Sequence, residues 1–212
     1  LGLVGSEMCI RDRCYAGNLQ HVRSFAERKR LSQNYMRQAG EILQALQAFN
    51  IPADILSGTG TGTFDIDCDI PEVTEIQPGS YIMMDADYYN IESVDNQHFT
   101  RFKPALTLLA TVISNNQREN VTIDAGLKSF YLDKSTPIVL QPAHFGMHYE
   151  WGFGDEHGKL TKPLDAKIAL NTKVELMVSH CDPTVNLFDH LYITQDDRVI
   201  DIWPIDLRGK SQ

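Results

Sequence analysis

His180 and Asp182 are the residues whose types and spacing most directly suit chemistry. They stand two positions apart after the alternating apolar run 174–178. If the extended conformation continues, both side chains point to one face and that of Cys181 to the other. An imidazole and a carboxylate suit a divalent ion such as Mn²⁺, Mg²⁺ or Zn²⁺, with water and substrate oxygens completing the shell. The spacing alone also fits a simple hydrogen-bonded pair.

A second candidate is the loop 57–63, which reads SGTGTGT. Small residues, backbone N–H groups and hydroxyls are what a phosphate group needs from a site without lysines. The loop lacks the GK[ST] of a P-loop and the glycine spacing of the dinucleotide fingerprint, and it equally fits a flexible loop. The turn Gly79, Ser80 and Tyr81 could add a second anion contact, although by itself it is an ordinary turn.

Other polar residues have weaker signals. Tyr15, Gln20 and His21 form a polar cluster, in which His21 is a possible general base or a solvated loop residue. Lys128 in the segment DAGLK is a candidate for a lysine that forms an imine with a cofactor. We expect a surface or ion-paired lysine instead, because nothing nearby predicts the desolvation that lowers a lysine pKa.

The elements that must position these residues differ between the two halves of the chain. Ser24 and Glu27 form a capping-box signature before a helix predicted over 25–49, and a short strand over 53–56 leads into the loop. Such a loop lies at the end of a strand where α/β folds place ligands. Downstream, strands are predicted over 81–84, 105–113, 120–124, 138–141, 174–178, 191–194 and 199–203, with a tight hairpin turn over 195–198.

The composition of the 212-residue chain limits the function classes. With 42% hydrophobic and 22% charged residues it is typical of a globular protein, and no stretch approaches the length of a membrane helix. A net charge of -9 argues against nucleic-acid binding. The four cysteines show no disulfide framework, so the expected location is a reducing cytoplasm.

The first residues do not resemble the start of a protein. The segment 1–13, LGLVGSEMCIRDR, has no initiator Met and looks like a translated sequencing adaptor. We therefore exclude it from fold reasoning and expect that the natural sequence starts near Cys14 with something lost upstream. The alternative is an ordinary N-terminal extension.

Many motifs in one order resemble a known family. From Tyr15 to Gly209 the chain carries YAGNLQH, SGTGTGTF, EIQPGSYIMMDADY, TIDAGLK, GDEHG, HCDPTVNLFDH and IWPIDLRG. Together these resemble the D-threonine aldolase, 3-hydroxy-D-aspartate aldolase and D-serine dehydratase group of alanine-racemase-like, fold-type III enzymes that use pyridoxal phosphate (PLP). The resemblance implies an α/β barrel remnant over 14–90, the C-terminal portion of a (β/α)8 barrel. A mostly antiparallel β domain over 91–212 and a homodimeric full-length protein are also implied.

The resemblance also implies roles for individual residues. His180 and Asp182 match the metal ligands, and Tyr15 and His21 match active-site residues of the aldolases. His21, directly or through a water, would remove the proton of the β-hydroxyl of a D-3-hydroxy amino acid, and Cα–Cβ cleavage would give glycine and an aldehyde. The residues that match the phosphate-binding segments of PLP are Gly58, Gly60, Thr61, Gly62, Thr63, Gly79, Ser80 and Tyr81.

Several alternatives stay open within and outside this group. D-serine dehydratases, which yield pyruvate and ammonia, look like HxC at the metal motif, whereas Asp182 favours an aldolase and favours Mn²⁺ or Mg²⁺ over Zn²⁺. The substrate side chain, D-threonine or 3-hydroxy-D-aspartate, is undecided. The lysine that anchors PLP in the family lies far upstream of YAGNLQH, so we expect this chain to be inactive and its full-length parent active. A different class, a non-catalytic β domain that binds a metal or small molecule, is the third hypothesis.

Overall fold

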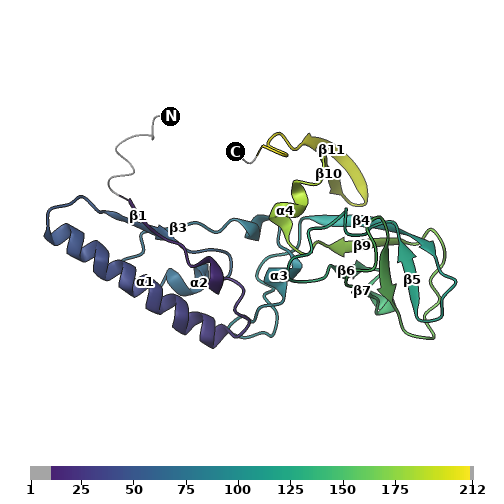
Figure 1. Ribbon diagram of the computed structural model, residues 1–212, viewed down its shortest axis with the longest axis horizontal. Coiled ribbons are helices and arrows are strands. Elements are labelled where there is room, and N and C mark those ends of the chain that lie inside the picture. The colour runs from purple at the N-terminus through teal and green to yellow at the C-terminus, as the bar shows by residue number, and fades with distance from the viewer. Residues whose placement is uncertain (1–10, 211–212) are drawn as a thin grey trace. The chain divides into compact units, whose positions relative to one another are not determined.

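The computed structural model describes residues 11–210, which fall into two units (Figure 1). The first unit contains the chain up to Ile82 together with Tyr88–Lys103, and the second contains Met83–Asp87 and the chain from Pro104 onward. Of the segment 1–13, residues 1–10 lie outside the described residues. The remaining three belong to strand β1 (Arg11–Cys14).

The first unit has a parallel sheet covered by a long helix. Strand β1 pairs with β2 (Ile55–Gly58), and β2 pairs with β3 (Glu75–Ile76), both in parallel. Parallel neighbours need a crossover, which α1 (Phe25–Ala48) supplies between β1 and β2. The buried core between helix and sheet contains Met36, Leu43, Ala53, Leu56 and Ile70. The short elements η2 (Gly17–Leu19), α2 (Phe64–Asp67) and η3 (Ser80–Ile82) complete the connections, and α3 (Ala86–Tyr89) lies where the chain crosses between the two units.

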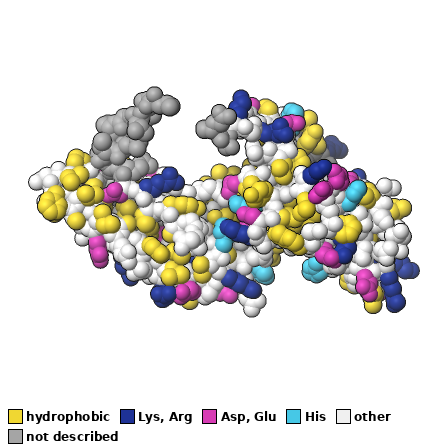
Figure 2. Space-filling model, in the orientation of Figure 1, with side chains coloured by type: hydrophobic (Ala, Val, Ile, Leu, Met, Phe, Trp, Pro, Cys, Tyr) yellow, Lys and Arg dark blue, Asp and Glu magenta, His cyan; other side chains and the backbone are white. Residues whose placement is uncertain are grey.

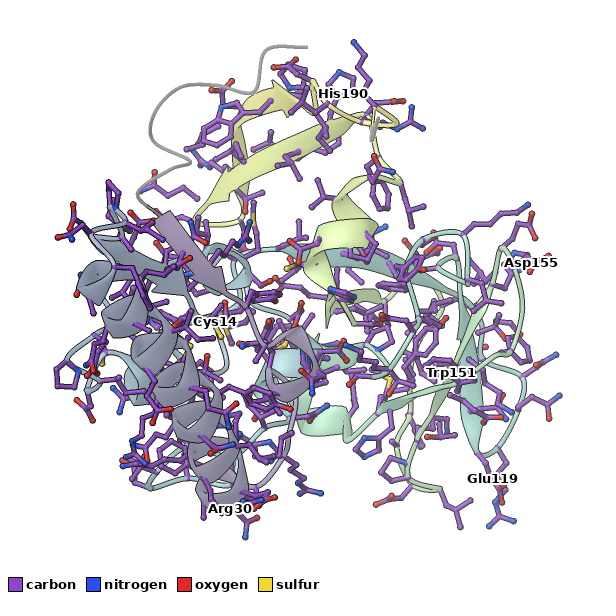
Figure 3. All side chains as sticks on the ribbon, turned by 60° about the vertical axis from the view of Figure 1, so that its left-hand side comes forward. Cys14, Arg30, Glu119, Trp151, Asp155 and His190 are labelled. Atoms are coloured by element: carbon purple, nitrogen blue, oxygen red, sulfur yellow. The ribbon has the colours of Figure 1, made fainter. Side chains whose placement is uncertain are left out.

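Helix α1 begins where the sequence predicts, but only half of the capping box forms. Ser24 Oγ accepts a hydrogen bond from Glu27 N at 3.4 Å. The Glu27 carboxylate binds the Arg30 guanidinium through both oxygens, at 2.7 and 2.8 Å, because a charged partner three residues on offers a stronger bond than a backbone N–H. Figure 3 labels Arg30 near this end of the helix and Cys14 at the end of β1.

The second unit contains an antiparallel six-stranded sheet in the order β6-β9-β4-β5-β8-β7. Its edge strands β6 and β7 contact each other, so the sheet curls into a nearly closed barrel. Buried side chains inside it include Val112, Ile123, Phe130, Leu160 and Leu176. The strands are β4 (Thr107–Ser114), β5 (Asn120–Ile123), β6 (Ile138–Gln141), β7 (His148–Glu150), β8 (Gly158–Thr161) and β9 (Lys173–Met177).

Two smaller helical elements and a hairpin complete this unit. These are η4 (Ala143–Phe145), α4 (Cys181–Val185), and strands β10 (His190–Gln195) and β11 (Arg198–Pro204). The hairpin turns at Asp196 and Asp197, where the sequence predicts a tight turn, and both have the positive φ angles, 48° and 59°, that a type I′ turn requires.

Most predicted strands are confirmed, and one is wrong. Residues 81–84 do not form a strand: η3 covers the first part, and Met84 has a φ of 54°, which extended backbone does not allow. Strands β7 and β8 were missed because they are only three and four residues long and each contains a single residue of the β-branched or aromatic types that mark strands.

The described residues include no helix that is both long and apolar enough to span a bilayer. On the face shown in Figure 2, Lys and Arg side chains are scattered among acidic ones.

Candidate functional site

The glycine-threonine loop of the first unit is buried and joined to the second predicted anion contact. Strand β2 leads into it, and Thr59, Thr61 and Thr63 are at most 2% exposed. Thr61 Oγ1 accepts a hydrogen bond from Tyr81 N at 3.1 Å. The loop and the turn at 79–81, predicted separately, therefore lie side by side.

Besides Thr61, the other two threonine hydroxyls of the loop also form hydrogen bonds within the protein. Thr59 Oγ1 donates to Asp67 Oδ2 at 2.9 Å, and Gln20 Nε2 donates to Thr63 Oγ1 at 3.1 Å. Thr59 has a φ of 69°, a strained conformation for a β-branched residue, and its bond to Asp67 helps to hold it. Burial raises the pKa of Asp67, although bonds from Ser32, Thr63 and Thr59 oppose the shift. A phosphate group here would depend on backbone N–H groups and on Thr61 more than the sequence suggested.

Close packing explains the glycines within the loop, whereas Gly79 has space beside it. A Cβ added at Gly58 would lie 1.9 Å from Cys14 O, and one at Gly62 would lie 2.1 Å from Gln20 O. At Gly79 a Cβ would meet nothing within 4 Å. The solvent-exposed side of the two joined segments is therefore at Gly79.

A buried cation lies behind the loop. The Arg28 side chain is 0% exposed, and its guanidinium donates to the carbonyl oxygens of Gly62 (2.7 Å), Val22 (2.6 Å) and Glu92. Burial lowers the pKa of Arg28 from its usual value, and Asp65 and Glu92 oppose that shift. Sequence reasoning missed this residue, although its helical spacing with the buried Ser32 and Met36 was a usable signal.

Tyr15 and His21 lie in the same unit as the loop. Tyr15 is 52% exposed, and a Cβ at Gly60 would lie 3.2 Å from its ring. The His21 ring packs against Tyr88 with 4.5 Å between centroids. Through the intervening Gln20, which binds Gly62 N and Thr63, this segment is fastened to the loop.

The second unit carries His180 and Asp182, and their proximity has a different cause from the one predicted. The extended conformation ends at His180, because helix α4 begins at Cys181, whose N–H donates to Asp85 Oδ2 at 2.8 Å. The turn into the helix nevertheless leaves His180 Nε2 3.6 Å from Asp182 Oδ2. Cys181 points the other way, into the core, as predicted.

Further carboxylates surround the other ring nitrogen of His180. Its Nδ1 lies 3.1 and 3.3 Å from the two carboxylate oxygens of Asp133. One ligand atom each from Asp87, Asp133 and His180 lie within 4.8 Å of one another. Sequence reasoning missed both aspartates. Asp87 was visible in the quoted motif MMDADY, but no local signal connects Asp133 to a histidine 47 positions away.

Electrostatics favours a cation at this cluster. The carboxylate of Asp182, and then that of Asp133, stabilise the imidazolium and raise the pKa of His180 to about 9, against partial burial. Burial also raises the pKa of Asp87, with a bond from Ser135 opposing. An imidazole and several carboxylates form the nitrogen and oxygen donor set of a divalent transition metal, so the residues fit such an ion.

Lys128 has the role that the sequence favoured. Its side chain is 67% exposed and forms an ion pair with Glu156. The hydrogen bond to Glu156 raises the pKa of Lys128, which is the opposite of what a nucleophilic lysine needs.

Comparisons with known proteins match almost the whole chain. The family model described as "Putative serine dehydratase domain" matches residues 105–194. The chain is 32% identical over 199 residues to a 3-hydroxy-D-aspartate aldolase from Paracoccus denitrificans, covering 93% of the chain and 50% of that protein. It is 36% identical over 199 residues to a D-threonine aldolase from Arthrobacter sp., covering 93% of the chain and 51% of that protein. The chain thus spans about half the length of these curated relatives.

Solved structures show the same fold. A D-threonine aldolase from Filomicrobium marinum matches with a TM-score of 0.81 and 33% identity, over 94% of this chain and 53% of that one. The D-threo-3-hydroxyaspartate dehydratase from Delftia sp. HT23 matches with a TM-score of 0.73 and 23% identity, over 91% and 54%. At that identity the second likeness concerns the fold alone.

Proposed function

Because this chain is related to the D-threonine aldolases and 3-hydroxy-D-aspartate aldolases, we propose that it is part of a PLP- and divalent-metal-dependent aldolase. The substrates would be D-3-hydroxy amino acids, which the enzyme cleaves to glycine and an aldehyde. The observation that carries this proposal is the imidazole and carboxylate of His180 and Asp182, 3.6 Å apart, in a chain with such relatives.

We assign the metal to His180 Nε2 and the Asp182 carboxylate. The two donor atoms are 3.6 Å apart, which is long for a direct hydrogen bond and close enough for a single ion to bind both. The Asp182 side chain is 67% exposed, which leaves room for water and a substrate hydroxyl, and its hard oxygen favours Mn²⁺ or Mg²⁺.

We assign the phosphate of PLP to the buried loop, Gly58, Gly60, Thr61, Gly62 and Thr63, and to the adjoining turn, Gly79, Ser80 and Tyr81. The Thr61 to Tyr81 contact and the space at Gly79 support this assignment. When bound, PLP supplies the electron sink that C–C cleavage requires. The positive charge of Arg28 behind the loop favours an anion there.

His21 and Tyr15 are the remaining residues to which we give roles, and the role of His21 is to remove a proton from the substrate. His21 accepts the proton of the substrate β-hydroxyl, directly or through a water, and Tyr15 lies beside Gly60 at the loop. A divalent cation held by His180 and Asp182 would supply the Lewis acidity that lowers the pKa of a hydroxyl. We further propose that the first unit is the C-terminal portion of a (β/α)8 barrel and that the whole protein is a homodimer.

A dehydratase is the second candidate, because the family model over 105–194 carries a serine dehydratase description. Both curated aldolases match over 93% of the chain, which favours the aldolase and disfavours a non-catalytic β domain. Supplying D-serine, D-threonine and 3-hydroxy-D-aspartate separately distinguishes the two reactions: an aldolase releases glycine and aldehyde, and a dehydratase releases a keto acid and ammonia.

The test of the function uses the parent protein extended to the length of its relatives, with PLP and Mn²⁺. We expect aldehyde release that EDTA abolishes, and a loss of at least about 100-fold in Mn²⁺-dependent turnover for His180→Ala and Asp182→Ala. The matched control is Asp165→Ala, an exposed aspartate of the same unit, which should retain turnover. Full activity in the first two variants would refute the metal assignment.

A further inference from the structure

Asp133 contacts His180 on the side away from Asp182. Both Asp133 oxygens are within hydrogen-bond distance of Nδ1, at 3.1 and 3.3 Å, whereas Nε2 is the nitrogen near Asp182. The two carboxylates therefore lie near different nitrogens of the same ring. Their environments also differ, since the Asp133 side chain is 31% exposed and that of Asp182 is 67% exposed.

The two nitrogens of a metal-bound imidazole differ chemically, so the contacts of Asp133 with Nδ1 and of Asp182 with Nε2 have different roles. A neutral imidazole bound to a metal through one nitrogen carries its proton on the other. An ionised carboxylate can only accept hydrogen bonds, so Asp133 favours the tautomer with the proton on Nδ1. That tautomer leaves the lone pair of Nε2 directed to the side of Asp182.

The backbone around Asp133 is fixed to the same helix that carries Asp182. Tyr131 N donates to Thr184 Oγ1 at 3.1 Å, which attaches the segment containing Asp133 to α4. On the other side, Ala86 N and Asp87 N donate to the carbonyl oxygens of Val178 and Ser179, at 2.9 and 3.1 Å. The His180 backbone is thus held between two segments, and Asp133 is positioned to orient its ring.

We propose that Asp133 is a positioning residue that accepts the Nδ1 proton of His180 and thereby presents Nε2 to a divalent cation. This inference rests on the proposed metal assignment and deepens it. It differs from a site in which Asp87, Asp133 and Nδ1 of His180 are themselves the ligands. Carboxylate partners of this kind typically contribute 10- to 100-fold to metal affinity.

The first experiment measures Mn²⁺ affinity of the 212-residue chain by competition with a chelator. We expect Asp133→Ala to weaken binding about 10- to 100-fold. Asp133→Asn should lose less, because its amide oxygen still accepts from Nδ1, and the exposed control Asp165→Ala should bind as the parent chain does. An affinity of Asp133→Ala within twofold of the parent chain overturns the proposal. A complete loss equal to that of His180→Ala also overturns it, because Asp133 would then be a ligand.

The second experiment needs no variant of Asp133. Long-range ¹H–¹⁵N correlation of the chain with one equivalent of diamagnetic Zn²⁺ reports which nitrogen of each histidine is protonated, and His180→Gln identifies the relevant signals. A proton on Nδ1 and a metal-shifted Nε2 support the proposal, and the reverse pattern overturns it. Failure of the underlying metal assignment can be distinguished from failure of this proposal. In that case His180→Ala and the unmutated 212-residue chain would bind Mn²⁺ equally.

Discussion

Arg28 and Arg30 are two residues apart on one helix, and their guanidinium groups differ in burial and in hydrogen-bond partners. Arg28 is fully buried and satisfies carbonyl oxygens from three different segments, whereas Arg30 pairs with Glu27 at a side-chain exposure of 66%. Exposed pairs contribute little to stability, but a buried acceptor that loses its donor carries a full desolvation penalty.

This contrast yields a stability prediction for the first unit. Arg28→Met should lower the free energy of unfolding by at least about 3 kcal/mol, since several buried carbonyl groups lose their donor at once. Arg30→Met, the matched control, should stay within about 0.5 kcal/mol. Urea unfolding followed by far-ultraviolet circular dichroism suits the measurement, because α1 is the long helix of this unit. Equal midpoints for the two variants would contradict the role given to Arg28.

At the scale of elements, strand β7 places a tyrosine in the closed interior of the second unit. Tyr149 is 6% exposed, and its hydroxyl donates to Ala125 O at 3.2 Å. The strand approaches β8 closely, since a Cβ at Gly158 would lie 2.7 Å from the Tyr149 ring. Burial raises the pKa of Tyr149 to about 12.

The raised pKa predicts how stability depends on alkaline pH. In the unfolded chain tyrosine ionises near pH 10, so the folded state holds this proton more tightly. The contribution of the protonated phenol to the free energy of unfolding is fully present below about pH 10. It is lost as the pH rises through 12, a change of roughly 3 kcal/mol. Comparing urea unfolding of the parent chain and Tyr149→Phe at several pH values isolates this effect.

The difference in free energy of unfolding between the unmutated chain and Tyr149→Phe should narrow between pH 10 and pH 12. Tyr192→Phe is the control, because Tyr192 is 64% exposed and its replacement should leave the pH dependence unchanged. A constant difference for Tyr149→Phe would show that the phenol ionises as readily in the folded protein as in water.

At the scale of the whole molecule, the relation to longer relatives matters most for activity. The chain spans about half of each curated aldolase, and we keep the expectation that the lysine that anchors PLP in the family lies outside it. Lys128, the lysine that most invited this role, is an exposed ion-paired residue. We therefore predict that the 212-residue chain binds Mn²⁺ through its second unit but does not turn over substrate.

The measurement compares this chain with its extended parent at equal concentration, with PLP, Mn²⁺ and D-threonine or 3-hydroxy-D-aspartate. Aldehyde release should be confined to the parent. Turnover by the 212-residue chain at a normal rate would mean that another residue anchors PLP, and reduction with borohydride followed by peptide mapping would identify it.

The sequence by itself determined the elements with strong local signals. Helical spacing and the Ser24 cap predicted α1, alternation predicted most strands of the second unit, and the turn residues Asp196 and Asp197 predicted the hairpin. The proximity of residues that are close in sequence, such as His180 and Asp182, could also be predicted, because a short separation along the chain limits how far apart they can lie.

Only the tertiary structure decided which distant groups meet. Asp133 reaches His180 across 47 positions, and Asp85 caps α4 across 96, so no local pattern could predict either contact. The hydroxyls of Thr59 and Thr63, which looked available to a ligand, bind Asp67 and Gln20 because burial requires partners for polar groups. Local propensity therefore specified the elements, whereas burial and hydrogen bonding between remote segments determined the chemistry around His180.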